Sequence, residues 1–348
     1  MKEDKRITIK DVASKAGVSV ATVSRVMNDA DYSISQALRQ RVKLAVEELG
    51  YVPNELARSL KGNFSRDVGV VLPNITNQFY LQALVGISRV SAQKHYNIIL
   101  CNTAGSVEEE RRCLQELYKK QVKGIIISSI GNESSHIKNL IDLGMHFVLL
   151  DQHFDDIDCP SIMFDCKTGA KMAVEHLVSA GHKRIALASM PLTRWSRIQV
   201  FEGYRDTMKA FGLGFDERAV FVPEKTLGSE SENYELEAGR ILGESFLERQ
   251  DDYTAVLCNN DMVAISFIQT LMKGGVAVPD DVSVMGFDNI PLAEYMLPQL
   301  TTVSYPSAET GGLAMTMLHN NIQHNQEFLN LDMSLVPRII QRESVISI

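Results

Sequence analysis

Residues 8–28 read TIKDVASKAGVSVATVSRVMN, and this stretch decides how the amino-terminal part of the chain folds. Thr8 followed by Asp11 is the signature of a capping box, in which each side chain satisfies a free backbone N–H group at the start of a helix. That helix should end at Gly17, because glycine tolerates the positive φ of a helix stop. A second helix, Val20–Met27, should follow directly. Two short helices joined by a tight turn predict a helix-turn-helix.

The outward side of the second predicted helix is its most informative surface. It carries small side chains and one arginine, namely Val20, Ala21, Ser24 and Arg25. A helix that met only water would more typically carry Glu and Lys at these positions. In a major groove, arginine can form two hydrogen bonds with guanine, and Val or Ala can contact a thymine methyl group. The pattern therefore predicts a recognition helix, while a helical hairpin that binds nothing remains the alternative.

A third helix is predicted from Ser35 to the next glycine, and the segment after it reads YVPNELARSLKG at residues 51–62. The Pro-Asn pair in this segment favours a helix start, and the final glycine favours a stop. A helix of two turns is too short to be stable alone in water, so it must form against a partner, and DNA is the obvious one. The alternative is that Leu56 and Leu60 simply pack on the next domain.

Charge is distributed unevenly along the chain. Residues 1–66 hold 12 Lys and Arg against 8 Asp and Glu, whereas the remainder holds 23 against 35 and the whole chain has a net charge of −8. A basic amino-terminal segment followed by an acidic remainder is typical of one domain that binds phosphate groups and one that does not. A chance asymmetry of the surface is the plain alternative.

Several classes of protein are disfavoured by composition and motifs. No stretch approaches the roughly 20 apolar residues that span a bilayer, so we expect no membrane partner. The charged start MKEDKR is unlike a signal peptide, which predicts a cytoplasmic protein. The 5 cysteines are scattered and lack CxxC spacing, as is typical of reduced thiols. Histidine clusters, nucleotide-binding motifs and nucleophile elbows are missing from the sequence, so we expect no metal, no cofactor and no enzyme activity.

From Asp67 onward the chain alternates short β-rich runs with helix-length segments. The runs are Val68–Leu72, Tyr96–Cys101, Gly124–Ser128, Phe147–Asp151, Ser161–Asp165, Arg184–Ala188, Ala219–Val222, Thr254–Cys258 and Val282–Phe287. This is the βαβ rhythm of a doubly wound parallel sheet, and there is enough of it for two sheets. The predicted fold class is α/β, with an N-terminal helix-turn-helix domain in front of these sheets.

Ligands of doubly wound folds bind beyond the carboxyl ends of the strands. The candidate ligand contacts there combine amide, carboxylate, hydroxyl and aromatic groups: Phe79, Asp151, Trp195, Ser196, Asn260 and Asp288. Such a set suits a small polar ligand with many hydroxyl groups, because carboxylates accept their hydrogens and ring faces cover sugar C–H groups. Core packing is the alternative role for Phe79 and Trp195, and a helix cap or structural hydrogen bond is the alternative for the aspartates.

Residues 8–28 and 51–62 resemble the LacI/GalR family of bacterial repressors in order, spacing and residue type. The resemblance implies base contacts from Val20, Ala21 and Arg25. It implies phosphate contacts from Thr8, Ser19, Thr22, Ser24, Asn28 and Ser35. It also implies that paired hinge helices at about residues 53–62 place Ala57 and Leu60 in the minor groove, where Leu60 wedges into a base step.

The body resembles the same family in five segments. They are PNITNQF at 73–79, GHKRI at 181–185, NDMVA at 260–264, VPDDVSVMGFDN at 278–289 and PQLTTV at 298–303. The family's body is similar to periplasmic sugar-binding proteins, with the effector held between two lobes, and the resemblance implies that Asn260 and Asp288 contact it. It implies a DNA-binding domain at 1–62 and an effector-binding and dimerisation domain at 66–348. The N-lobe is expected at about 66–163 and 292–323, and the C-lobe at about 164–291 and 324–348.

One position departs from the family pattern. Many sugar- and purine-responsive members place an arginine three residues before a Gly-aromatic pair, and here Val200 stands before Gly203-Tyr204. Arg194 or Arg197 can substitute, but neither is in register. The loss of a bidentate donor disfavours the family's usual way of binding a monosaccharide. An unusual effector or a partner protein remains the alternative.

The most economical interpretation is an effector-controlled repressor of a carbohydrate-utilisation operon. It would bind pseudo-palindromic double-stranded operator DNA as a homodimer, because a two-fold dimer reads two half-sites. A solute-binding protein of a transport system would leave the basic amino-terminal segment unexplained and needs a signal peptide. An enzyme acting on a sugar could recruit Asp151, Asp261 and Asp288, but no nucleophile–base spacing supports it.

Overall fold

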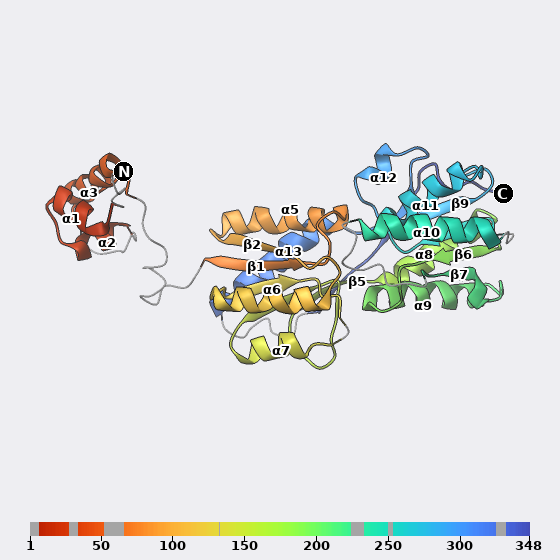
Figure 1. Cartoon of the computed structure of the whole chain (residues 1–348), viewed down its shortest axis with the longest axis horizontal. Helices are drawn as coiled ribbons and strands as arrows, with labels where there is room; N and C mark the ends of the chain where they lie inside the picture. The colour runs from red at the N-terminus through yellow and green to blue at the C-terminus, as the bar shows by residue number, and fades with distance from the viewer. Residues whose placement is uncertain are drawn as a thin grey trace, which may run out of the picture. The chain divides into compact units, whose positions relative to one another are not determined.

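The computed structural model describes residues 7–27, 34–51, 66–131, 133–223, 233–249, 253–324 and 332–348. The chain divides into an amino-terminal unit that ends at residue 65 and a larger unit of residues 66–348 (Figure 1). The predicted hinge helix, with Ala57 and Leu60, lies outside the described residues, as does Asn28. None of the described helices is both long and apolar enough to cross a membrane.

The amino-terminal unit is a helix-turn-helix followed by a third helix, as predicted. Its helices are α1 (Ile9–Ala16), α2 (Val20–Met27) and α3 (Gln36–Leu49). The Asp11 carboxylate accepts the Thr8 backbone N–H at 2.8 Å, and Gly17 ends α1 with a φ of 61°. Val12, Val23 and Val42, one from each helix, are fully buried together in its small core.

The N-lobe is built on a sheet with the strand order β11-β5-β4-β3-β1-β2, in which neighbouring strands are parallel. The strands are β1 (Asp67–Leu72), β2 (Asn97–Asn102), β3 (Gly124–Ile127), β4 (His146–Leu150), β5 (Ser161–Phe164) and β11 (Asp332–Leu335). The helices are α5 (Gln78–Gln93), α6 (Val107–Lys119), α7 (Ser135–Asp142) and α13 (Ser307–His324). Successive strand residues face opposite sides. Val70 therefore joins the core under α5 and α13, and Val71 the core under α6 and α7.

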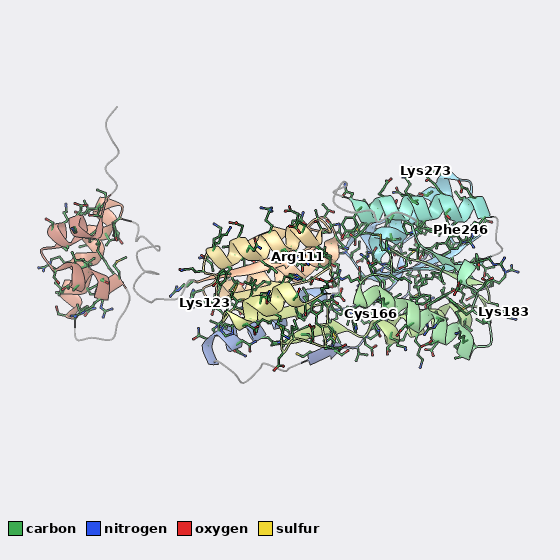
Figure 2. All side chains as sticks on the ribbon, turned by 60° about the horizontal axis from the view of Figure 1, so that its bottom comes forward. Arg111, Lys123, Cys166, Lys183, Phe246 and Lys273 are labelled. Atoms are coloured by element: carbon green, nitrogen blue, oxygen red, sulfur yellow. The ribbon has the colours of Figure 1, made fainter. Side chains whose placement is uncertain are left out.

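The C-lobe repeats this plan with the strand order β12-β10-β9-β8-β6-β7, and only β12 is antiparallel to its neighbour in the described sheet. The strands are β6 (Ile185–Ala188), β7 (Val220–Phe221), β8 (Ala255–Cys258), β9 (Ser283–Asp288), β10 (Thr301–Ser304) and β12 (Arg338–Ile340). The helices are α8 (Cys166–Ser179), α9 (Trp195–Ala210), α10 (Tyr234–Arg249), α11 (Asp261–Lys273) and α12 (Leu292–Tyr295). Inside this lobe Phe246 packs its ring 5.5 Å from the rings of Phe221 and Phe267 (Figure 2).

The two doubly wound parallel sheets confirm the predicted fold class, but the predicted division between the lobes is wrong for two strands. β10 falls within 292–323, yet it pairs with β9 of the C-lobe. β11 falls within 324–348, yet it pairs with β5 of the N-lobe. In the N-lobe sheet β11 lies at the edge beside β5, and in the C-lobe sheet β10 lies beside β9. A segment from later in the chain therefore extends each sheet. The described chain therefore crosses between the lobes near Asp165, Pro306 and Val336.

Candidate functional site

The outward surface of α2 has the composition that the sequence predicted for a recognition helix. Val20 is 38% exposed, Ala21 and Arg25 are exposed, and Ser24 is half-buried. The inward residues Val23 and Val26 are buried, so the outward set faces away from the core of the unit.

Hydroxyl groups lie at the starts of the three amino-terminal helices. Ser19 Oγ accepts the backbone N–H of Thr22 at 3.1 Å, and Ser35 caps α3 by accepting the N–H of Leu38. Thr8 occupies the same place before α1. The N–H groups of a helix start point at an incoming anion, so these three positions are suited to DNA phosphates.

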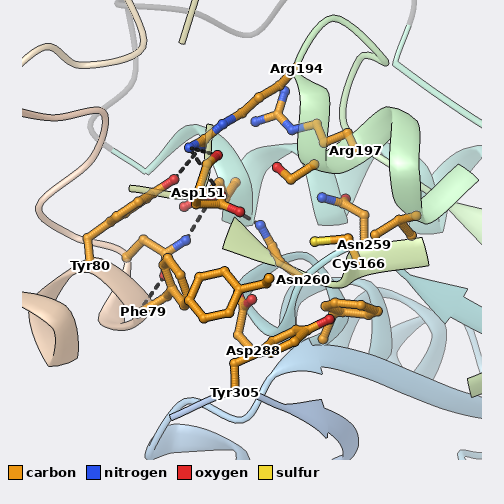
Figure 3. Close-up of a pocket in the computed structure, with 16 residues that line it drawn as sticks. Phe79, Tyr80, Asp151, Cys166, Arg194, Arg197, Asn259, Asn260, Asp288 and Tyr305 are labelled. Carbon is orange, nitrogen blue, oxygen red and sulfur yellow. Dashed lines mark hydrogen bonds and ion pairs between the residues drawn. The ribbon is translucent and has the colours of Figure 1, made fainter. Parts of the chain in front are cut away.

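A pocket lies between the lobes, at the carboxyl ends of both parallel sheets (Figure 3). It contains about 500 Å³ of atom-free space, part of which is open to solvent. From the N-lobe it is lined by Asn77, Phe79, Tyr80, Asp151 and Phe164. From the C-lobe and the crossing segments it is lined by Cys166, Arg194, Ser196, Arg197, Val200, Glu235, Asn259, Asn260, Phe287, Asp288 and Tyr305.

Five of the six residues that the sequence predicted as ligand contacts line this pocket: Phe79, Asp151, Ser196, Asn260 and Asp288. Trp195 does not line it. It begins α9, and its neighbours Arg194, Ser196 and Arg197 line the pocket instead.

Arg194 joins the two lobes, and its side chain is almost completely buried. Its Nη1 donates a hydrogen bond to the Tyr80 hydroxyl, and its Nη2 donates to Ser128 Oγ at 2.6 Å. The same Nη2 lies 3.2 Å from the Asp151 carboxylate. Arg194 belongs to the C-lobe and all three partners belong to the N-lobe, so this guanidinium holds the lobes together.

Glu235 of α10 makes a second buried connection. Its Oε2 accepts Asn74 Nδ2 at 3.1 Å, and its Oε1 accepts Asn77 Nδ2 at 2.8 Å and Asn260 Nδ2 at 3.0 Å. Burial raises the pKa of Glu235, and the amide of Asn77 partly offsets that rise. Asn74 and Asn77 come from the N-lobe, so Glu235 also bridges the lobes. Glu235 could not be identified from the sequence, because a glutamate on a helix carries no signal of such burial.

The acidic end of the pocket contains Asp288, whose backbone has a φ of 118° at the end of β9. Burial, and then the negative charges of Asp261, Asp151 and Glu235, raises the pKa of Asp288 well above its ordinary value. Burial also raises the pKa of Asp261 to about 7, although Thr302 donates a hydrogen bond to it at 2.6 Å.

Aromatic rings form one wall of the pocket. Phe164 lies with its ring centroid 5.4 Å from that of Phe79 and 4.6 Å from that of Tyr305. Phe287 continues the wall, 5.6 Å from Tyr305. These rings can cover an apolar face of a ligand or interact with a cation through their π faces.

The departure at Val200 is visible in the pocket. Val200 lines it with a side chain that is 3% exposed, and two guanidinium groups come from earlier positions, those of Arg194 and Arg197. The pKa of Arg197 is lowered by burial and then by the neighbouring charge of Arg194. Within the described ranges no cluster of His, Cys, Asp and Glu is suited to a metal ion.

A helix-turn-helix with an exposed recognition surface, joined in one chain to two lobes around a polar pocket, defines the class of ligand-responsive DNA-binding regulators. Two family models match the chain. One, described as bacterial regulatory proteins of the lacI family, covers residues 8–54. The other, described as periplasmic binding proteins and the sugar-binding domain of the LacI family, covers residues 65–337. The chain belongs to the LacI family, and it is accordingly a regulatory protein and not an enzyme.

Similar proteins span nearly the whole chain. The HTH-type transcriptional repressor PurR of Vibrio atlanticus is 31% identical over 340 residues, which are 97% of this chain and 98% of that protein. The lac repressor dimer bound to operator and an anti-inducer has a TM-score of 0.85 at 25% identity, covering 98% of this chain and 100% of that one. The transcriptional regulator CelR in complex with cellobiose has a TM-score of 0.72 at 26% identity, covering 97% and 100%. The match at residues 8–54 lies in the basic amino-terminal segment, which a solute-binding protein of a transport system would leave unexplained.

Proposed function

We propose that this chain is an effector-controlled transcriptional repressor that binds operator DNA through α2 and senses a small polar molecule, a sugar or sugar derivative, in the pocket between its lobes. It acts in the cytoplasm as a homodimer on a pseudo-palindromic operator, and its target is a carbohydrate-utilisation operon. The observation that carries the proposal is the pocket itself, because polar side chains of both lobes converge in it within the same chain as a helix-turn-helix.

The DNA-binding part of the proposal assigns Val20, Ala21 and Arg25 to base contacts. It assigns the phosphate contacts to Thr8, Ser19, Thr22, Ser24, Asn28 and Ser35. The exposed outward surface of α2 supports the first assignment, and the helix starts support the second for Thr8, Ser19 and Ser35. The similarity to a lac repressor dimer bound to operator supports the two-fold mode of binding.

The sensing part of the proposal assigns the effector to Phe79, Asp151, Ser196, Asn260 and Asp288. Their positions around one pocket support the assignment, and so does the similarity to a regulator in complex with cellobiose. A ligand can couple to DNA only if it binds one arrangement of the lobes more tightly than another. An inducer must therefore bind the DNA-free form more tightly than the DNA-bound form.

The proposal is tested by an electrophoretic shift assay with fragments of the genes that flank this one, with and without a panel of sugars. We expect one fragment to be retarded at concentrations at which unrelated DNA is not, and one compound to change that affinity. Equal retardation of all fragments at moderate salt would contradict the assignment of a sequence-specific regulator, because non-specific binding is weak and falls steeply with salt.

The hinge prediction concerns Leu60, in the segment of about 53–62 that we assign to the hinge helix. Leu60→Ala should lower operator affinity and reduce DNA bending while dimerisation stays intact, because an apolar wedge is needed only in the kinked duplex. A circular-permutation assay measures the bend, and sedimentation measures the dimer. Leu56→Ala is the matched control. A bend that is unchanged in Leu60→Ala would be evidence against a wedge.

A second prediction concerns the effector response. Asp288→Ala should keep operator binding but lower the affinity for the effector by about tenfold or more, because a hydrogen bond to a charged group is lost. Calorimetry with the compound found in the shift assay measures this loss. Asp280→Ala, which removes an exposed carboxylate instead, should bind that compound as the unmodified protein does. Equal affinity of Asp288→Ala and the unmodified protein would remove Asp288 from the site.

A further inference from the structure

The carboxylates of the pocket differ in how they are satisfied. Asp151 is paired with Arg194 at 3.2 Å, and Glu235 accepts hydrogen bonds from three side-chain amides. Asp288 receives no hydrogen bond or ion pair from any side chain in the described part of the chain. It is therefore the acidic group of the pocket that is left for a ligand.

The field around Asp288 favours a positive charge. The carboxylates of Asp261, Asp151 and Glu235 all act on it, and Arg194 opposes them only in part. The Cys166 thiol also faces it, but burial raises the pKa of that thiol and keeps it neutral. Arg194 and Arg197 enter the pocket from the side of α9, away from Asp288 and Tyr305 (Figure 3). The pocket thus has a basic end and an acidic end.

Two of the side-chain amides that line the pocket already make hydrogen bonds within the chain. Asn260 donates to Glu235 and accepts the N–H of Val263 at 2.8 Å, as the cap of α11. Asn77 donates to Glu235 and accepts the N–H of Phe79 at 2.9 Å. A hydroxyl group both donates and accepts, whereas an ammonium group only donates. Asp288 that has lost its proton beside a bound cation only accepts, so in that state it matches the ammonium group.

The aromatic wall lies at the same end of the pocket. Tyr305 appears beside Asp288 in Figure 3, and its ring packs on those of Phe164 and Phe287. A cation over such ring faces is attracted by their quadrupoles, and the attraction grows when the cation is desolvated. A carboxylate next to aromatic rings is a general arrangement for holding an organic ammonium group.

We propose that the Asp288 end of the pocket binds a protonated amine, so that the effector is a small polar amine such as an amino sugar and not a neutral sugar or a sugar phosphate. This inference rests on the proposed function only in taking the pocket as the effector site. A phosphate placed at this end would meet Asp288 and its neighbouring carboxylates instead of a cation.

The test compares probes that differ in one functional group. The pairs are glucosamine against glucose, ethanolamine against ethylene glycol, and diaminobutane against butanediol, with glucose 6-phosphate as the anionic probe. Thermal unfolding of the full-length protein should shift upward more with the amine of at least one pair than with its hydroxyl partner or with the phosphate. Calorimetry should then find the amine bound about tenfold or more tightly than that partner.

Proton release supplies a second, independent measurement. A carboxyl whose pKa is high in the free protein and falls beside a bound cation releases a proton at every pH between the two pKa values. Titration of the protein with the amine in unbuffered salt, held at constant pH, should therefore release protons. A ligand that binds only through hydroxyl groups leaves the charge of Asp288 nearly unchanged.

The matched variants are Asp288→Asn and Asp280→Asn. The first removes the charge of Asp288 and keeps its shape, and asparagine tolerates the positive φ at that position. It should abolish the preference for amines and the proton release, whereas Asp280→Asn should keep both. A preference that survives in Asp288→Asn overturns the proposal, as does a panel in which no amine exceeds its hydroxyl partner. If amines bind but do not alter operator affinity, the amine site stands and the effector role of the pocket fails.

Discussion

Replacing Arg25 with alanine should remove most of the discrimination between operator and random DNA. Among the outward residues of α2, Arg25 has the one long side chain that can donate two hydrogen bonds to a base edge. A good bidentate contact of this kind contributes about 1–3 kcal/mol of discrimination, and a two-fold dimer makes it twice. Weak binding that decreases steeply with salt should remain, because phosphate contacts are untouched.

The measurement is a competition shift assay in which the selected operator competes with random DNA at several salt concentrations. Arg41→Ala is the matched control, since it also removes one exposed positive charge from the amino-terminal unit but lies on α3. We expect Arg41→Ala to lower the affinity for operator and for random DNA by a similar factor. If Arg25→Ala discriminated as well as the unmodified protein, α2 would not be the recognition helix.

Replacing Arg194 with alanine should give the largest loss of stability in the sensing body. The change leaves the Asp151 carboxylate buried without its positive partner, and removes hydrogen bonds to Tyr80 and Ser128. Removing one member of a buried pair costs about 3–5 kcal/mol, most of it from the charge left behind. Since the lost contacts cross between the lobes, the lobes should also separate.

Thermal unfolding measures the loss of stability, and small-angle X-ray scattering measures the separation. Adding Asp151→Asn to Arg194→Ala should restore part of the stability, because it removes the stranded charge. Arg197→Ala is the control, since the one hydrogen bond resolved for Arg197 goes to the Pro191 carbonyl within the same lobe. A double variant no more stable than Arg194→Ala would indicate that the buried pair contributes little.

The three described helices of the amino-terminal unit could be predicted from sequence, because their signals are local. The caps at Thr8 and Ser35 and the stop at Gly17 lie within a few residues of the backbone groups that they satisfy. The β-rich runs were predicted with similar success, and the observed strands β1 to β9 begin and end close to the expected positions. β10 and β11 were assigned to the wrong lobes, because their partners are distant strands and pairing partners leave no local mark.

The pocket could be predicted only in part, for a related physical reason. Phe79, Asp151 and Asn260 follow strands, and the rule that sites form at the carboxyl ends of parallel strands identifies such positions. Glu235 could not be found this way, because its role depends on a hydrogen bond to Asn74, 161 positions away in the chain. Trp195 was predicted as a contact because it is aromatic, but its neighbours Arg194 and Ser196 line the pocket and Trp195 does not.

The residues that join the lobes are largely different from those left open to a ligand. Arg194 and Glu235 form hydrogen bonds with other side chains of the chain, whereas no such bond is found for Asp288 among the described residues. Mutations can therefore change the ligand preference of the pocket without changing the contacts that join the lobes. A duplicated copy of this gene can acquire a different effector through substitutions at the acidic end of the pocket. It can still keep the contacts between the lobes through which effector binding is coupled to DNA binding. Divergence in such a lineage should be fastest around Asp288 and slowest around Arg194.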